Sequence, residues 1–427
     1  MNFADKDKKY IWHPFTQMKG WLKDEIVIIE RGEGCYLYDT EGRQYIDGVS
    51  SLWCNIHGHR VTAIDNAIKL QLDKIAHSTF LGLSSVPAIE LAEKLIQIAP
   101  KGLTRVFYSD SGSEAVEVAL KMAFQFWQNL GEKSRQLFMT LKEAYHGDTI
   151  GSVSVGGVEL FHGTYRPLLF ETVKVLPTLE SVEGAMHKYG GEIAAFVFEP
   201  LVQCAGGFIV QPPGFVRGVR KLCDKYNILM VVDEVATGFG RTGKMFACEW
   251  ENVTPDIMVI AKGITGGYLP LSATLTTEKI FEAFLGEYME KKTFYHGHTY
   301  TGNQLACVAA LANLRLFEEG KILEKLQPKI EMLRRGLERF EELNHIGKVK
   351  NIGFIGVIEL VRNKMPLELY PFEERIGHRV ILEARKRGAI LRPLGDTIVL
   401  MPPLTIADKD LQELLYITYD SIEAVTK

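Results

Sequence analysis

Two stretches decide the fold of this chain: ILMVVDEVATGFGRTG at residues 228–243 and DIMVIAKGITGGY at residues 256–268. Each begins with a run of Val, Ile, Leu and Met, which is typical of a strand buried on both faces. Asp233 follows the first run and Lys262 follows the second. In open α/β sheets, ligands bind beyond the carboxyl ends of such strands. We therefore expect Asp233 and Lys262 to lie together at the ligand-binding edge of a sheet.

A carboxylate beside a lysine amine is the pair of side chains that pyridoxal phosphate needs. The amine forms a Schiff base with the cofactor aldehyde, and the acid keeps the pyridine nitrogen protonated. The pair therefore predicts pyridoxal 5'-phosphate as the cofactor, with Lys262 and Asp233 as catalytic residues.

Strand-like apolar runs alternate with helical patterns through the middle of the chain. A long helix is expected at residues 113–130, and the strand candidates are residues 104–109, 136–141, 172–177, 193–200, 228–234 and 256–263. Such alternation predicts an α/β fold with a mainly parallel central sheet and helices on both faces.

The two flanks of the chain have a different pattern. Residues 26–47 predict a small antiparallel meander, and residues 389–405 predict two strands around a Pro-Leu-Gly-Asp turn before a C-terminal helix. We therefore expect a smaller α+β domain built from both chain ends. The predicted division is residues 1–58 and 316–427 for the small domain and 59–315 for the large cofactor-binding domain.

The composition of the 427-residue chain is that of an ordinary globular enzyme, with 46% hydrophobic and 24% charged residues. A net charge of −4 without a basic run argues against nucleic acid. The six cysteines are scattered and predict free thiols. Neither a signal-peptide core in MNFADKDKKY nor an apolar run of about 18 residues is present, so no membrane partner and a cytoplasmic location are expected.

Residues 111–114, Ser-Gly-Ser-Glu, separate a predicted strand from the long helix that follows it. Ser111 and Glu114 have the spacing of a capping box, which explains the motif without any ligand. Exposed helix N–H groups also bind anions, and glycine permits close approach. Beside Asp233 and Lys262, the motif favours a cup for the cofactor phosphate.

Residues 238–243, GFGRTG, match the G-x-G-x-x-G spacing of dinucleotide-binding proteins. That motif must follow a strand directly and open a helix, and KMFACEW after residue 243 has no helix start. We therefore exclude a dinucleotide and interpret this stretch as a flexible loop near the site. Lys262-Gly263 does not complete a nucleotide-triphosphate motif either.

Three histidine-containing stretches could hold a metal ion: His146 by itself, residues 57–59 and residues 296–298. A tight zinc site needs further ligands at supporting spacing, and none accompanies these histidines. We interpret them as loop histidines and predict no metal site.

Two further residues have alternative interpretations. Tyr145 follows the strand at residues 136–141 and could either stack on a flat ring or close the core. Arg392 precedes Pro393 in the C-terminal hairpin and is either a carboxylate ligand or a surface arginine.

Several motifs resemble those of the class-III, fold-type-I aminotransferases, namely VVDEVATGFGRTG, AKGITGGYLPLSATLTT and HGHTYTGNQLACVAAL. Five more are similar to the branch that aminates 8-amino-7-oxononanoate in biotin synthesis: WHPFTQM, GVSSLWCNIHGH, DSGSEAVEVALKMA, YHGDTIGSVSVGG and RPLGDTIVLMPPLT. The resemblance covers nearly the whole chain and implies ping-pong transamination, with the keto acid and an amino donor as small-molecule substrates.

The resemblance also assigns roles to individual residues. It implies that Lys262 carries the cofactor, that Asp233 contacts its ring nitrogen and that Tyr145 stacks on its ring. The implied phosphate ligands are Gly112 and Ser113 from one subunit and His298 and Thr299 from the second, which implies a homodimer with shared active sites.

The implied substrate contacts come from several segments of the chain. They are Phe15, Trp53, Tyr145, Lys262, Gly297 and Arg392, with Arg392 holding the carboxylate of the oxononanoate. Glu199 matches an acidic residue near the cofactor.

One departure concerns the amino donor. Members that use S-adenosylmethionine carry tyrosine where this chain has Phe15, and a phenyl ring can stack but cannot donate a hydrogen bond. The spellings PFTQM, GKMFACEW and GHTYTGNQ are similar to a subgroup that uses lysine. We expect S-adenosylmethionine as donor, with lysine, or a different class-III ω-aminotransferase, as the alternatives.

Overall fold

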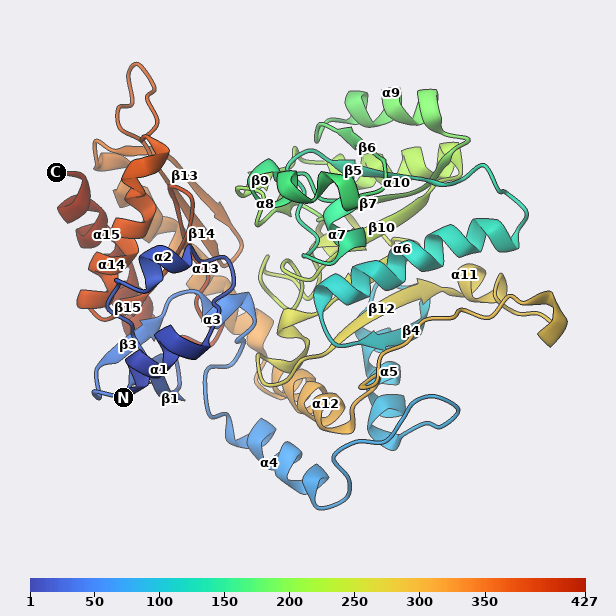
Figure 1. Cartoon of the computed structure of the whole chain (residues 1–427), viewed down its shortest axis with the longest axis horizontal. Helices are drawn as coiled ribbons and strands as arrows, with labels where there is room; N and C mark the ends of the chain where they lie inside the picture. The colour runs from blue at the N-terminus through green and yellow to red at the C-terminus, as the bar shows by residue number, and fades with distance from the viewer.

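A seven-stranded sheet contains the apolar runs that precede Asp233 and Lys262 (Figure 1). The computed structural model describes residues 1–427. In spatial order the strands are β4 (Leu103–Ser109), β12 (Ser272–Thr277), β11 (Ile257–Ile260), β10 (Leu229–Asp233), β7 (Ile193–Phe198), β5 (Leu137–Leu141) and β6 (Thr172–Val175). Only β12 runs antiparallel to its neighbours, β11 and β4. The prediction of a mainly parallel sheet is therefore confirmed.

Helices cover both faces of this sheet, and the side chains of β10 are divided between them. Val231 packs in one cluster with residues of α6 (Gly112–Asn129). Met230 and Val232 pack in another with residues of α9 (Leu179–Tyr189) and α10 (Phe215–Tyr226). Because successive strand residues point to opposite faces, a continuous apolar run is what such a buried strand requires.

Two four-stranded sheets lie on the other side of the molecule (Figure 1). Their orders are β1 (Ile29–Glu33), β2 (Tyr36–Asp39), β3 (Gln44–Asp47), β15 (Ala389–Ile390), and β13 (Ile346–Ile352), β14 (Ile355–Leu360), β17 (Thr397–Leu400), β16 (Arg392–Leu394). The antiparallel meander and the C-terminal hairpin are thus confirmed. Since β15 pairs with β3, the two chain ends form one structure, while the domain boundaries at residues 58 and 315 stay predictions.

The remaining elements surround these three sheets. The other α-helices are α1 (Phe3–Tyr10), α2 (Met18–Trp21), α3 (Ser50–Trp53), α4 (Thr62–Leu72), α5 (Val86–Ile98), α7 (Ile150–Ser154), α8 (Glu159–His162), α11 (Glu278–Glu282), α12 (Gln304–Glu319), α13 (Ile322–Glu338), α14 (Ile376–Lys386) and α15 (Asp408–Thr426). A two-stranded ribbon joins β8 (Val202–Gln203) to β9 (Ile209–Val210), and the 3-10 helices are η1 (Gly163–Leu168), η2 (Ala247–Glu251), η3 (Lys262–Thr265), η4 (Tyr288–Glu290), η5 (Arg339–Glu342) and η6 (Phe372–Glu374). No helix is long and apolar enough to span a membrane, and all six cysteines are unpaired.

The stretch at residues 238–243 is buried and links segments that are distant in the sequence. Arg241 in it is 1% exposed and donates hydrogen bonds to Pro402 O (2.6 Å), Ser50 Oγ (2.8 Å) and Asn55 O (3.1 Å). A short 3-10 helix, η2, begins at Ala247 within KMFACEW, where no helix start was predicted, and the exclusion of a dinucleotide stays a prediction. The interpretation as a flexible loop is wrong, because the guanidinium fixes this stretch to both ends of the chain.

Candidate active site

A cavity of about 840 Å³ lies beyond the carboxyl ends of β10 and β11. Six of the predicted catalytic, cofactor-binding and substrate-binding residues line it: Trp53, Gly112, Ser113, Tyr145, Asp233 and Lys262. Glu199 and His146 line it as well. The parallel pairing of β10 with β11 explains this gathering, because it brings the ends of both strands to one edge of the sheet.

Asp233 is the last residue of β10, and its carboxylate is held from two sides. His146 Nδ1 forms a 2.7 Å hydrogen bond with Asp233 Oδ2, and the Val235 N–H donates to Oδ1 at 3.0 Å. Both side chains of the pair are buried, and His146 Nε2 has no partner. This role of His146 was not predicted, although its position after a predicted strand, beside Tyr145, was a usable signal.

Lys262 begins η3, two residues beyond the end of β11. Its φ of +42° is a sparsely populated backbone conformation for a non-glycine residue, and such conformations cluster at functional sites. Its amine, Nζ, lies 5.5 Å from the centre of the Trp53 ring. Trp53 is itself buried, with a φ of +63° and an indole N–H that has no acceptor.

Glu199 follows β7 and is the buried acid of the cavity. Its Oε1 accepts the Cys204 N–H at 3.1 Å, whereas Oε2 has no partner. Burial raises the pKa of Glu199 to about 8, and the negative charge of Asp233 adds to the rise. At neutral pH this carboxyl group therefore carries a proton and can donate a hydrogen bond into the cavity.

The N-terminus of α6 forms another wall of the cavity. Ser111 caps the helix and Glu114 completes the predicted capping box, while Gly112 and Ser113 occupy the first turn. A helix leaves its first N–H groups without carbonyl partners and carries a partial positive charge there. This end of the cavity is consequently suited to an anion.

The loop after β5 carries Tyr145 against this helix end. The Tyr145 hydroxyl donates to Asp148 Oδ2 at 2.8 Å. Burial, followed by this hydrogen bond, raises the pKa of Tyr145, and the positive charge of Arg392 opposes the rise. The phenol stays protonated at neutral pH, with its ring on the wall of the cavity.

Five of the residues that the sequence singled out do not line the cavity: Phe15, Gly297, His298, Thr299 and Arg392. The guanidinium of Arg392, on β16, has no hydrogen bond or ion pair within the chain, and its charge acts on Tyr145. Gly297 and Thr299 are exposed, on the loop that leads to α12. Phe15 is 58% exposed.

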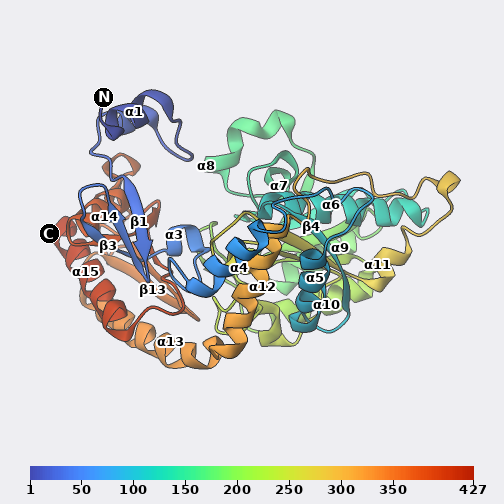
Figure 2. The ribbon, with the colours of Figure 1, turned by 90° about the horizontal axis from the view of Figure 1, so that it is seen from below.

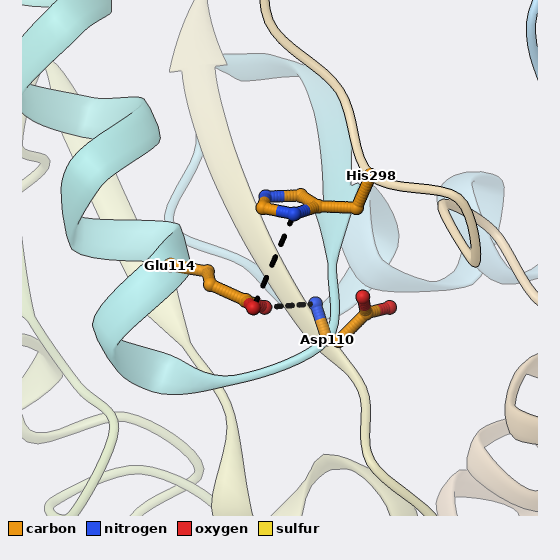
Figure 3. Close-up of side chains that lie close together, drawn as sticks. All are labelled: Asp110, Glu114 and His298. Carbon is orange, nitrogen blue, oxygen red and sulfur yellow. Dashed lines mark hydrogen bonds and ion pairs between the residues drawn. The ribbon is translucent and has the colours of Figure 1, made fainter. Parts of the chain in front are cut away.

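His298 gathers with two acids of its own chain, as Figure 3 shows. Its Nδ1 lies 4.0 Å from Glu114 Oε1, and Asp110 completes a group with the composition of a metal site. The Glu114 carboxylate is already engaged, because Oε2 accepts the N–H groups of Asp110 and Ser111 at 2.9 Å each. These contacts explain Glu114 as a helix cap, and the expectation of no metal stays a prediction.

The cavity fits pyridoxal phosphate in its donor set as well as in its residue types. An amine and a histidine-held carboxylate lie at neighbouring strand ends, and a helix N-terminus offers N–H groups to a phosphate. Two buried polar atoms, Glu199 Oε2 and Trp53 Nε1, have no partner in the protein. Buried polar groups rarely remain unpaired, so a polar ligand is expected here.

Known proteins resemble this chain over its whole length. The profile of the family Aminotransferase class-III matches residues 19–422. The adenosylmethionine-8-amino-7-oxononanoate aminotransferase of Aquifex aeolicus is 54% identical over 429 residues, which cover 96% of this chain and 94% of that protein. The protein of the same name from Anoxybacillus flavithermus is 52% identical, covering 100% of this chain and 97% of that one.

Solved structures agree with these relatives. The adenosylmethionine-8-amino-7-oxononanoate aminotransferase of Methanocaldococcus jannaschii has a TM-score of 0.97 at 48% identity, over 99% of this chain and 98% of that one. An ω-transaminase of Pseudomonas jessenii, solved in complex with PMP, has a TM-score of 0.95 at 30% identity, over 100% and 98%. This chain therefore belongs to the class-III aminotransferase family and is a transaminase that depends on pyridoxal phosphate.

Proposed function

We propose that this enzyme transfers an amino group from S-adenosylmethionine to 8-amino-7-oxononanoate and so forms 7,8-diaminononanoate for biotin synthesis. Within the chain, Arg392 supports the keto-acid substrate, because its guanidinium has no protein partner. An arginine of this kind binds a carboxylate with two parallel hydrogen bonds. The names of full-length relatives at 54% and 52% identity support the same substrates.

Different residues of the cavity are assigned to different parts of the cofactor. We assign the phosphate to the N–H groups of Gly112 and Ser113, the ring nitrogen to Asp233 and the ring face to Tyr145. When bound, pyridoxal phosphate supplies an aldehyde that reacts with amines and a ring that withdraws electrons. His146 positions Asp233, so that this carboxylate stabilises a proton on the ring nitrogen.

Lys262 is assigned the covalent attachment of the cofactor and the transfer of a proton to and from the substrate carbon. A lysine that forms such a bond gives ping-pong kinetics, because the first product leaves before the second substrate binds. Trp53 lies 5.5 Å from the amine, and Arg392 is assigned the distal carboxylate of the keto acid.

A second copy of the chain completes the site in this proposal. Gly297, His298 and Thr299 would reach the partner's cavity, with His298 and Thr299 on the cofactor phosphate and Gly297 beside the substrate. The segment before them extends from the body of the molecule (Figure 1) and carries exposed apolar side chains, among them Tyr288 (87% exposed) and Met289 (79% exposed). These exposed apolar side chains support an interface at this segment. The homodimer and the cytoplasmic location are parts of this proposal.

A half-reaction with the purified holoenzyme tests the donor. We expect S-adenosylmethionine alone to remove the visible absorbance band of the bound cofactor, and 8-amino-7-oxononanoate added afterwards to restore it. Borohydride treatment before the donor should label Lys262. Lysine in place of S-adenosylmethionine is the control.

Two results would contradict the proposal in different ways. A response to lysine but not to S-adenosylmethionine would give the alternative donor. Absence of diaminononanoate with either donor would favour an ω-transaminase of other specificity. The ω-transaminase of Pseudomonas jessenii, which is 30% identical to this chain, is an example of that class.

A further inference from the structure

Lys262 lies in a backbone conformation that depends on support from neighbouring segments. It begins the four-residue 3-10 helix η3 with a φ of +42°. Short 3-10 helices have weak hydrogen-bond geometry, and a strained residue persists only where the surrounding structure fixes it. The position of the Lys262 amine therefore depends on the contacts that hold η3.

Asn313 on α12 supplies the most direct of these contacts. Its Nδ2 donates to Gly263 O at 3.0 Å and to Ile264 O at 2.9 Å, the carbonyls of the two residues that follow Lys262. Asn313 is 0% exposed, and a hydrogen bond in the protein interior is electrostatically stronger than one in water. The amide therefore fixes the backbone directly after the lysine.

Gly263 and Gly266 permit close packing around η3. Gly266, the C-cap of η3, has a φ of +65°, and a Cβ there would lie 3.0 Å from Asn313 Oδ1. A Cβ on Gly263 would lie 2.8 Å from the Cβ of Phe239, in the loop after β10. The 3-10 helix is therefore packed against both α12 and that loop.

The helix that carries Asn313 is itself anchored in the core. Figure 1 and Figure 2 show α12 crossing from the side of the large sheet toward α13, on the side of the smaller sheets. Leu314 and Phe317 of α12 pack in one buried apolar cluster with Ile264 of η3. Because α12 is fixed in this way, its amide can hold η3 in a defined place.

We propose that Asn313 is a positioning residue for the covalent attachment of the cofactor, because it holds η3 so that the Lys262 amine is presented to the cofactor aldehyde. The inference rests on the proposed role of Lys262 and extends it to a residue outside the cavity. Asn313 does not line the cavity and acts only through the backbone of η3. Its loss should weaken the bond between Lys262 and the cofactor, while the groups assigned to the phosphate and the ring keep their places.

Two forms of the cofactor separate this positioning role from a general loss of structure. Pyridoxal 5'-phosphate can bond to Lys262, whereas pyridoxine 5'-phosphate has an alcohol in place of the aldehyde and uses only the non-covalent contacts. On titration of the apoprotein, we expect the Kd for pyridoxal phosphate to rise about three- to tenfold in Asn313→Ala, the value of about one hydrogen bond. The Kd for pyridoxine phosphate should change less than about twofold, because it does not involve the lysine.

Asn351→Ala is the matched control. The Asn351 Nδ2 also donates to two carbonyls, Gly353 O at 2.9 Å and Ile355 O at 3.1 Å, and none of these residues lines the cavity. Both dissociation constants should stay at their wild-type values in this variant.

Asn313→Ala leaves two buried carbonyls without a donor, and Asn313→Ser carries the same test if that variant does not fold, because serine leaves space for a bridging water. An equal rise in both dissociation constants would overturn the positioning role, since it would indicate a distorted cavity. Unchanged binding of pyridoxal phosphate would overturn it as well. Borohydride labelling of the wild-type holoenzyme keeps the two proposals apart. If Lys262 is not labelled, its assigned role fails and this inference with it, whereas a labelled Lys262 with unchanged binding in the variant rejects the role of Asn313 alone.

Discussion

Glu199 is a buried acid surrounded by the groups that perform the chemistry. The residue is 4% exposed, and its carboxyl group lies near the charges of Asp233 and Lys262. Burial disfavours the ionised form, and the pKa of Glu199 accordingly rises from its ordinary 4.5 to about 8. A protonated carboxyl at neutral pH offers a ligand both a donor and an acceptor, and Oε2, which lacks a protein partner, is free to make such a contact.

Replacing Glu199 by Gln should change how the stability of the apoprotein depends on pH. The folded chain keeps a proton that the unfolded chain loses between pH 4.5 and about 8, so wild-type stability falls as pH rises through this window. The glutamine cannot ionise, and the Tm of Glu199→Gln should therefore increase relative to the Tm of wild type as the pH rises across the same window. Thermal unfolding at several pH values measures this difference. The exposed Glu180→Gln is the control, and an equal pH dependence in all three proteins would contradict the pKa.

At the scale of elements, the loop after β5 is pressed against the first turn of α6. Gly147 has a φ of +117°, and a Cβ there would lie 2.3 Å from Ser113 Oγ. The Ser113 hydroxyl also accepts the Thr149 N–H at 3.0 Å. Only glycine permits this approach, which brings Tyr145 and the proposed phosphate cup into one wall.

Replacing Gly147 by Ala should weaken cofactor binding, because the methyl group displaces Ser113 from the loop. Overpacking of this kind costs about 1–3 kcal/mol, and we expect the Kd for pyridoxal phosphate to rise roughly tenfold or more. Titration of the apoprotein with the cofactor measures it. Gly131→Ala, at the other end of α6, is the matched control, since Gly131 also has a positive φ (+83°) but no atom within 4 Å of the added Cβ. Equal losses in both variants would indicate backbone strain instead of the contact with Ser113.

At the scale of the whole molecule, Arg241 joins three parts of the chain. It extends from the loop after β10 to the segment of Ser50 and Asn55 and to Pro402 near the C-terminus. Ser50, Ser51 and Trp53 all have positive φ, so the segment that carries Trp53 needs external support. The buried guanidinium supplies this support with hydrogen bonds to carbonyl and hydroxyl oxygens.

Replacing Arg241 by Met should destabilise the protein and loosen the Trp53 segment. Three buried acceptors lose their donor, at about 1–3 kcal/mol each, and we therefore expect a loss of at least about 3 kcal/mol in the free energy of unfolding. Urea denaturation measures the loss, and limited proteolysis locates it. Arg135→Met is the control, because Arg135 is also buried but bonds only to Gly190 O and Ile193 O. Cleavage near residues 50–55 should increase in Arg241→Met alone. Equal cleavage there in both variants would argue against a stabilising role of Arg241 for this segment.

Local patterns predicted those parts of the fold that local chemistry controls. Asp233 and Lys262 were recognisable because buried parallel strands are continuous apolar runs, and ligands gather where such strands end. Strand β12 was missed, because SATLTT is rich in hydroxyl groups although it is buried. Its hydroxyls are satisfied by neighbours distant in sequence: Ser272 bonds to Ser109, and Thr274 donates to Ala115 O. No window of sequence contains those partners.

The sequence by itself determined the cofactor chemistry, the mainly parallel sheet and the contribution of both chain ends to a smaller structure. These follow from hydrophobic period and from the residue types at strand ends, both of which are local properties. Only the tertiary structure decided that His146 holds Asp233, that Arg241 ties the Trp53 segment and that Asn313 holds the backbone after Lys262. Each of these contacts joins residues 49 or more positions apart. The packing of the sheet and the return of the chain ends bring them together, and a linear pattern carries no record of that proximity.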